Sequence, residues 1–440
     1  MLLAFPYRLV PACWRRLYTD AVLVGVLAEI RLAGLRGGEG GMAAGAAEAV
    51  IRRLDLVLIV AGAPGEGRED VTHSLIHHIQ NNYLTSIHDK SPPTKRRRLS
   101  PPASPSASSR PPHPPPPLPA PHVTHPIRRF ASPPSLDQFI ALLKNPKPFV
   151  VSGGCADWPA AERWEVGYLA RQVGPARVVP VEAGGDYTKA GWGQQILPFK
   201  TFLDRLDALV GDGIPPPSHP TEDSPSLAGD ATLPPASVPL YLAQHDLFRQ
   251  FPSLLDDLII PDYVYACPSA PPDAPDYAPP STADGFLLNG WLGPAGTVSP
   301  AHTDPYFNLY AQVKGSKWVW TAPPGVAGYM AAYGEACEAG VQEGDPSASG
   351  EGGGGDDEDG GSDEDEAGGS AELMTNTARV DVTLPPTDAA LRRRHPSFVA
   401  RVAPVAQQTV LEAGDLLFLP PGWWHAMKSL SVSFSVSIWF

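Results

Sequence analysis

The sequence predicts a mainly β fold preceded by a helical N-terminal region, and three observations lead to this prediction. Between Leu430 and Ile438 apolar residues alternate strictly with serine, a period of two that is typical of a β-strand. Shorter apolar runs that end at glycine or proline follow residue 127 and also resemble strands. By contrast, apolar residues within the first 90 positions recur at helical spacing. Antiparallel strands of this kind are typical of sandwiches and barrels, which include the jelly rolls.

Composition limits the class of protein. The chain has 440 residues, and its 53 prolines and 42 glycines are too many for one compact domain, so unfolded connectors are expected. The four cysteines are far apart and form no CxxC pair, which excludes a disulfide scaffold and a zinc finger and favours a reducing compartment. No segment approaches the roughly 20 apolar residues needed to span a bilayer, so no membrane partner is expected.

Residues 1–90 are predicted to be helical. Apolar residues near the start of this region are spaced as on one face of a helix: Val22, Leu23, Val26, Leu27 and Ile30. A second set lies between Ala44 and Leu58. We therefore expect a small helical domain ahead of the β region.

Residues 91–126 are predicted to form a proline-rich, unfolded linker, because they include fourteen prolines. The basic cluster Lys95 to Arg98 lies inside this linker, and an exposed cluster of this kind is typical of a nuclear import signal. The alternative is a charge run that only aids solubility. We therefore predict a nuclear protein, with the cytoplasm as a second location.

Residues 127–440 are predicted to form one catalytic-sized domain with unfolded insertions at 213–237, 267–284 and 335–372. The last insertion holds fourteen Asp or Glu and no Lys or Arg, which equals the net charge of −14 of the whole chain. It is either a solvated loop or a tether for a basic partner, and its sign disfavours direct binding of nucleic acid.

Several strands are expected in this domain. Pro148 to Val151 and Arg177 to Val181 are short apolar runs. The strand at Leu430 to Ile438 should be half-buried, with its apolar face on a core and its serine face toward a cavity or solvent. Farther upstream, Tyr241 and His245 have the i, i+4 spacing of a helix, and His245 is expected to be structural.

Three residues have the pattern of metal ligands. His302 and Asp304 are two apart, so on a strand both side chains would point the same way. His425 follows the predicted strand GDLLFLP and a turn, and it would supply a third ligand. Two histidines and one carboxylate leave three coordination positions open, which is typical of non-haem Fe(II) oxygenases.

The sequence motifs around these residues are more specific for a protein family than the three residues themselves. They are NGWLGPAGTVSPAHTDPYFNLYAQVKGSKW from Asn289, YLAQHDLFRQFPSLLDDLIIPDY from Tyr241, and, downstream, GDLLFLPPGWWH and SFSVSIWF. Together with PFVVSGGCADWPA from Pro148, they resemble the Jumonji C (JmjC) family of Fe(II)- and 2-oxoglutarate-dependent oxygenases. The resemblance covers nearly all of the chain except its linkers and the acidic insertion. It implies a double-stranded β-helix, the jelly roll of the cupins, as the JmjC domain.

The resemblance implies a set of site residues. The metal ligands would be His302, Asp304 and His425, and no catalytic residue is implied beyond them. Lys317 would pair with the distal carboxylate of 2-oxoglutarate, beside Tyr241 and Asn308. Ser299, Trp291 and Trp439 are weaker assignments to the same pocket. The chemistry agrees, since a buried dicarboxylate needs a cation and hydrogen-bond donors.

The implied activity uses Fe(II), with 2-oxoglutarate and O2 as co-substrates, and yields succinate and CO2. Hydroxylation of an arginyl side chain in a basic protein or peptide, of histone or ribosomal type, is the expected reaction. Histone lysine demethylation is the alternative, but Asp304 in place of Glu and the absence of a cysteine-based reader module favour hydroxylation. Two other classes stay open. One is a cupin-fold binding or scaffold protein without turnover, and the other is a zinc hydrolase, for which no general base lies near the motifs.

Overall fold

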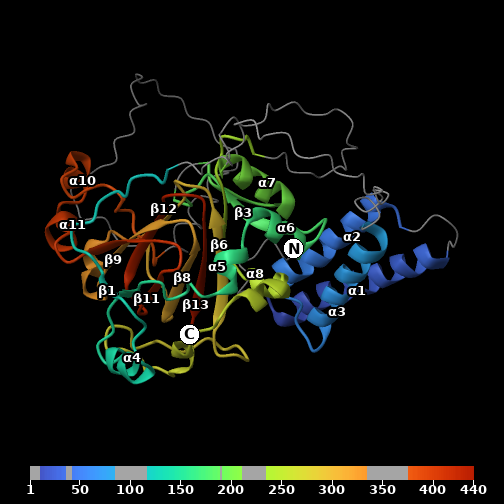
Figure 1. Ribbon diagram of the computed structural model, residues 1–440, viewed down its shortest axis with the longest axis horizontal. Coiled ribbons are helices and arrows are strands. Elements are labelled where there is room, and N and C mark those ends of the chain that lie inside the picture. The colour runs from blue at the N-terminus through green and yellow to red at the C-terminus, as the bar shows by residue number, and fades with distance from the viewer. Residues whose placement is uncertain (1–9, 36–41, 85–115, 189–190, 211–233, 334–374) are drawn as a thin grey trace, which may run out of the picture.

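The computed structural model describes residues 10–35, 42–84, 116–188, 191–210, 234–333 and 375–440. The predicted acidic insertion, the basic cluster and most of the insertion at 213–237 lie outside these residues. Figure 1 shows a group of helices at one end and packed β-sheets over the rest of the molecule. Among the described residues, no helix combines the length and the apolar character that a bilayer crossing requires.

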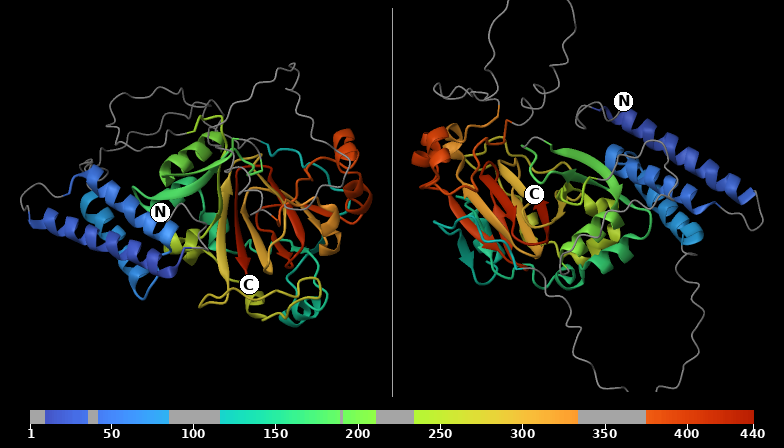
Figure 2. Two further views of the ribbon diagram at one scale, coloured as in Figure 1. Left: turned by 180° about the vertical axis from the view of Figure 1, so that it is seen from behind. Right: turned by 90° about the horizontal axis from the view of Figure 1, so that it is seen from above.

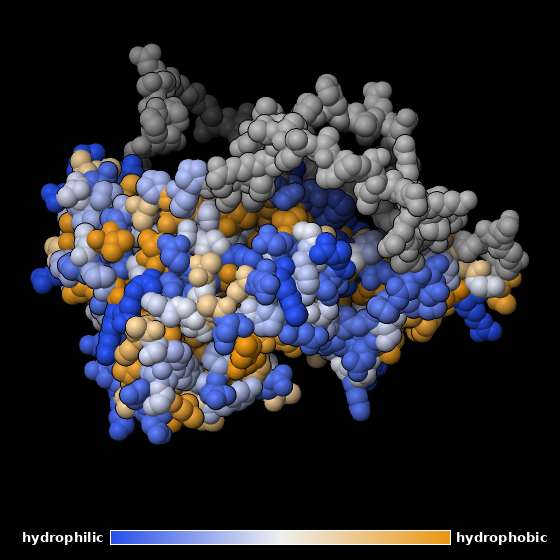
Figure 3. All heavy atoms as spheres, viewed as in Figure 1, coloured by the Kyte–Doolittle hydropathy of each residue, from blue (hydrophilic) through white to orange (hydrophobic). Residues whose placement is uncertain are grey.

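The helical N-terminal region contains α1 (Ala12–Leu35), α2 (Ala44–Leu56) and α3 (Arg68–Ile79), and α2 and α3 each end in a short π-helical segment. Its core is formed by apolar residues at helical spacing: Leu23, Val26, Val50, Ile51 and Leu54. The other side of α1 exposes large apolar side chains such as Leu17, Val24 and Leu35, and apolar residues lie along this edge of the molecule in Figure 3. The predicted helical N-terminus is therefore confirmed.

Two sheets form the β region. The strand order is β1-β2-β11-β8-β13-β6-β5-β3-β4 in the larger sheet and β10-β9-β12-β7 in the smaller one. The strands are β1 (Arg128–Phe130), β2 (Phe149–Val151), β3 (Val178–Ala183), β4 (Gly193–Pro198), β5 (Leu240–His245), β6 (Leu287–Gly293), β7 (Val298–His302), β8 (Asn308–Lys314), β9 (Lys317–Ala322), β10 (Gln407–Leu411), β11 (Leu416–Leu419), β12 (Trp424–Ser429) and β13 (Ser433–Trp439). Leu417 and Tyr310 of the larger sheet pack with Val319 and Met427 of the smaller one, so the sheets face each other across one interior. This is the predicted mainly β, cupin-like jelly roll.

Helices cover the outside of the larger sheet and its ends. They are α4 (Leu136–Leu142), α5 (Pro159–Arg163), α6 (Val166–Val173), α7 (Phe199–Val210) and α8 (Leu247–Gln250), with α10 (Ala389–Arg394) and α11 (Pro396–Arg401) beside the smaller sheet. Both views of Figure 2 place the helical N-terminal region next to the α6–α7 side and far from α10 and α11.

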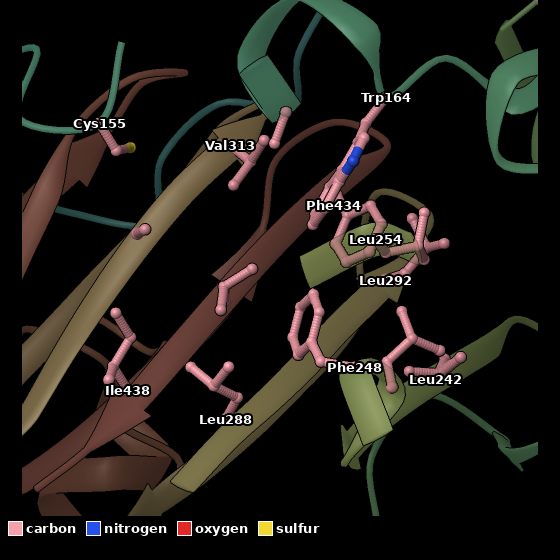
Figure 4. Packing of buried hydrophobic residues seen from close by; sticks show 14 of the residues in the cluster. Cys155, Trp164, Leu242, Phe248, Leu254, Leu288, Leu292, Val313, Phe434 and Ile438 are labelled. Carbon is pink, nitrogen blue, oxygen red and sulfur yellow. The ribbon is translucent and has the colours of Figure 1, made fainter. Parts of the chain in front are cut away.

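The alternating strand near the C-terminus is β13, and it is buried on both faces rather than half-buried as expected. Phe434 and Ile438 pack outward against Trp164, Leu288 and Phe248 (Figure 4). The serines face the interior between the sheets and are also covered: Ser433, Ser435 and Ser437. Their hydroxyl groups are hydrogen-bonded to side chains on neighbouring strands, which is what makes a buried serine row tolerable.

Three other expectations need correction. The segment from Tyr241 to His245 is strand β5 and not a helix, because it pairs with β3 and β6. Residues 267–284 have a defined path without a helix or strand, and the Tyr277 ring packs on Phe307. The end of the predicted linker, from residue 116, lies on the smaller sheet, where Trp318 Nε1 donates to His122 O at 2.6 Å. Aromatic and backbone contacts thus give an ordered path to segments that were predicted from their composition to be unfolded.

Candidate functional site

The three predicted metal ligands converge at one end of the interior. His302 is the last residue of β7, and His425 lies opposite it on the antiparallel strand β12. Asp304 lies in the turn after β7, not on the strand, and its carbonyl accepts from Gly422 N at 2.9 Å. Asp304 Oδ2 is 3.4 Å from His425 Nε2, and Asp304 Oδ1 is 3.9 Å from His302 Nε2. One donor atom from each residue lies within 4.8 Å of the others.

Backbone carbonyls fix the orientation of both imidazole rings. His302 Nδ1 is 2.7 Å from Pro300 O, and His425 Nδ1 is 3.0 Å from Trp423 O. A carbonyl oxygen only accepts, so each Nδ1 must carry a hydrogen. The Nε2 atoms of both rings, which point toward Asp304, are therefore the atoms free to ligate a metal.

Burial and mutual charge shift the pKa values of this cluster. Burial, reinforced by the neighbouring His425, lowers the pKa of His302 to about 4. Burial would raise the pKa of Asp304, but the hydrogen bond and charge of His425 outweigh it and lower that pKa. Burial opposes the charge of His425, but Asp304 outweighs it and raises the His425 pKa. The free cluster thus favours one carboxylate with one proton on His425, and a divalent cation would replace that proton.

Lys317, the first residue of β9, is buried deep between the sheets. Its side chain is 1% exposed, and Nζ donates to Tyr310 Oη at 2.8 Å and to Tyr241 Oη at 3.2 Å. Within the described part of the chain no carboxylate pairs with it. Burial lowers the pKa of Lys317 to about 7. A buried ammonium without an anion is unusual, because charged side chains are almost never fully buried unless paired.

Most other predicted pocket residues surround this lysine. Ser299 of β7 is hydrogen-bonded to Tyr241, and the Trp291 ring of β6 lies 6.2 Å from the Tyr241 ring between centroids. Trp291 Nε1 donates to Ser437 Oγ at 3.0 Å. The structure thus places Tyr241, Ser299 and Trp291 in the same part of the interior as Lys317.

The other two predicted pocket residues, Asn308 and Trp439, lie on the larger sheet. They are opposite each other on the neighbouring strands β8 and β13. Asn308 Oδ1 and Trp439 Nε1 are both buried, and neither has a hydrogen-bond partner among the described residues. Buried polar atoms of this kind are normally satisfied, so the pair indicates that a ligand or water belongs beside them.

Two residues of this pocket were not predicted. Tyr310, which holds Lys317, lies two residues after Asn308 on β8 and so faces the same side, a signal that the strand period alone could have given. Gly293, at the end of β6, lies directly against the ring of Tyr241. A Cβ atom there would be 2.5 Å from Tyr241 Cδ2, so the ring position depends on this glycine.

Tyr187 is linked to the metal cluster through Thr377, and two acidic residues lie close enough to affect the Tyr187 pKa. Thr377 forms a β-bridge with His302, and its Oγ1 is 3.4 Å from Tyr187 Oη. Burial raises the pKa of Tyr187 to about 12, with further contributions from Asp186, Glu182 and Asp304. Glu182, on β3, is partly buried, and burial raises its pKa. No sequence signal pointed to these residues.

The residues present fit Fe(II) and 2-oxoglutarate. Two imidazole nitrogens and one carboxylate, all from one side, are the ligand set of non-haem Fe(II) enzymes. The unpaired Lys317 ammonium and the unsatisfied Trp439 Nε1 suit a carboxylate-bearing molecule between the sheets.

Comparison with known proteins agrees with this geometry. Residues 135–440 match the cupin-like domain. Lysine-specific demethylase 8 of Xenopus tropicalis is 31% identical over 310 residues, which are 70% of this chain and 51% of that protein. Jumonji C domain-containing protein 5 of Drosophila melanogaster is 32% identical over 309 residues, 70% of this chain and 58% of that protein.

A more distant relative is the human bifunctional peptidase and (3S)-lysyl hydroxylase, which is 23% identical over 67% of this chain and 77% of that protein. The chain spans about half the length of the curated relatives that it matches first. The chain therefore belongs to the cupin-like domain family, within its branch of JmjC-domain proteins.

Proposed function

We propose that the protein is an Fe(II)- and 2-oxoglutarate-dependent dioxygenase that hydroxylates an arginyl side chain of a protein substrate. The observation that carries this proposal is the buried Lys317 ammonium, which has no carboxylate partner among the described residues and lies in the same interior as the convergent ligands His302, Asp304 and His425. A binding module without turnover would have no need for either feature, since each is costly in a buried interior.

The residues divide the work of binding. His302, Asp304 and His425 would hold iron, and Lys317 with Tyr310 and Tyr241 would hold the distal carboxylate of 2-oxoglutarate. When bound, these groups supply a four-electron reduction of O2 in which 2-oxoglutarate becomes succinate and CO2 and one oxygen atom enters a substrate C–H bond. The surrounding aromatic walls exclude water and orient the co-substrate.

Glu182, Asp186 and Tyr187 support a cationic substrate. Tyr187 lies beside Thr377, which pairs with His302, and the charges of Glu182 and Asp186 reach Tyr187, so we place the entrance for the substrate side chain at this group. The partly buried carboxyl of Glu182 is destabilised in its charged form and would gain from a cation. A guanidinium suits such a site because it donates to two acceptors at once. A basic protein, of histone or ribosomal type, and a nuclear location that uses Lys95 to Arg98 complete the proposal.

Intact-mass analysis tests this function. The purified protein would receive Fe(II), 2-oxoglutarate, O2 and ascorbate with arginine-containing basic peptides and matched methyl-lysine peptides, with His302→Ala as the control. Gain of one oxygen atom on arginine, absent in the control, is the expected result. Loss of a methyl group would instead support lysine demethylation, in line with the name of the Xenopus tropicalis relative. Failure to form succinate with metal bound would overturn the oxygenase proposal and favour a binding module.

A further inference from the structure

A buried carboxylate in the helical N-terminal region reaches into the β region. Asp55, in α2, is 0% exposed. Arg177 donates to it from Nη2 at 2.6 Å and from Nε at 2.9 Å, and the backbone N of Val178 donates at 2.9 Å. Gln250 Nε2 donates to it at 2.9 Å. All four donors belong to the segment that follows residue 126, so this contact joins the two regions.

Gln250 links this contact to strand β5 by further hydrogen bonds. Its Nε2 also donates to Val178 O at 2.7 Å, and its Oε1 lies 2.6 Å from His245 Nε2. His245 is the last residue of β5 and pairs with Gly290 after a bulge. The residue before it, Gln244, has φ +46°, a conformation that non-glycine residues rarely adopt. A bulge with such a residue persists only when its surroundings hold it.

The same strands carry groups of the proposed pocket. β3 and β5 are antiparallel, with Glu182 opposite Tyr241, so Val178 and His245 lie at one end of the pair. Tyr241 Oη is 3.2 Å from Lys317 Nζ. Asp55 therefore lies across the end of the two strands that carry Glu182 and place Tyr241 at the lysine.

We propose that Asp55 is a positioning residue for the 2-oxoglutarate pocket and that the helical N-terminal region is a working part of the catalytic unit. A buried ion pair adds little net stability compared with apolar residues of the same size. Its many directional bonds do fix geometry, here the ends of β3 and β5. This inference rests on the proposed function, since it concerns the binding of that co-substrate.

The test compares matched variants of the full chain. Asp55→Asn removes the charge with little change of shape. Gln250→Met keeps the Asp55–Arg177 ion pair and removes the side-chain bonds from Gln250 to Asp55, Val178 and His245, which covers the case in which Asp55→Asn fails to fold. Val50→Ala is the control, because Val50 is a buried residue of the same helix whose apolar side chain takes no part in these hydrogen bonds.

Two quantities are measured: 2-oxoglutarate affinity by calorimetry with Mn(II), and amide hydrogen exchange across residues 240–245 in the free protein. We expect Gln250→Met and Asp55→Asn to weaken affinity about tenfold, the loss of one misaligned bond to a charged group, and to speed exchange in β5. Val50→Ala should change neither by much. The steady-state KM for 2-oxoglutarate should rise more than kcat falls.

Affinity and exchange equal to those of Val50→Ala in both variants would overturn the inference. A wild-type chain that binds no 2-oxoglutarate would refute the proposed function, and the exchange of β5 would still decide whether Asp55 positions this strand. The two failures are thereby distinguished.

Discussion

Replacement of Lys317 by methionine should stabilise the fold while it removes 2-oxoglutarate binding. The side chain is 1% exposed and is held only by two tyrosine hydroxyls among the described residues. Methionine fills nearly the same volume and brings no charge into the interior. Residues chosen for stability alone would therefore not include a lysine here.

The structure gives the magnitude and its sign. The pKa of Lys317 falls from its ordinary 10.5 to about 7 on folding. At about 1.36 kcal/mol per unit, the charged lysine costs the folded state about 4 to 5 kcal/mol at pH 6. Between pH 7 and 10.5 the unfolded chain binds more protons than the folded chain, so wild-type stability rises with pH in this window. The advantage of methionine should thus shrink to about 2 kcal/mol at pH 9.

Urea unfolding at pH 6 and pH 9 measures this difference, and calorimetry measures 2-oxoglutarate affinity. Lys314→Met is the control, because Lys314 is partly exposed and pairs with Glu165 at the surface. The two tyrosine hydroxyls that lose their donor reduce the gain by about 1 kcal/mol. A Lys317→Met variant that is less stable than wild type at pH 6, or that still binds 2-oxoglutarate tightly, would refute the reasoning.

The same geometry leads to three further predictions. His302→Ala should weaken Mn(II) affinity by more than about 100-fold, because removing a metal ligand costs more affinity than removing a group that only supports a ligand. Unchanged metal content in this variant would contradict the proposed site. Gly293→Ala should force the Tyr241 ring aside and weaken 2-oxoglutarate binding about tenfold, unlike Gly325→Ala, whose Cβ meets nothing within 4 Å. Deletion of 340–370 should leave metal binding intact, because Tyr333 N donates to Thr377 O at 2.9 Å and already joins the flanking segments; loss of metal would count against this.

The sequence predicted those parts of the site that lie within short sequence motifs. His302 and Asp304 are two residues apart, and His425 follows its own strand, so spacing and motif were enough to predict all three as candidate ligands, and the structure brings their side chains together. The residues around Asp55 could not be found this way, because Arg177 lies 122 positions away and the bond forms only when two regions pack. In the sequence, the two partners are an ordinary helix residue and an ordinary residue at the start of a strand.

Errors arose where a local pattern has two readings. Tyr241 and His245 are four apart, a spacing that suits one helical turn as well as a strand with a bulge, and strand pairing with β3 and β6 decided the outcome. Proline content predicted an unfolded stretch at 267–284, yet one tyrosine ring packed on Phe307 gives it a defined path. In each case a tertiary contact outweighed the local preference, and no window of sequence contains such a contact.

Among the described residues, three buried polar groups of the pocket lack hydrogen-bond partners that a ligand could supply. Lys317 and Trp439 Nε1 need acceptors, and Asn308 Oδ1 needs a donor. All three are buried between the same two sheets, where each unsatisfied group destabilises the free protein. A dicarboxylate with bound water would satisfy them at once, so the energy lost in the free state returns on binding. The stability expected for Lys317→Met and the affinity expected to vanish with it thus have one physical origin, the burial of the lysine charge.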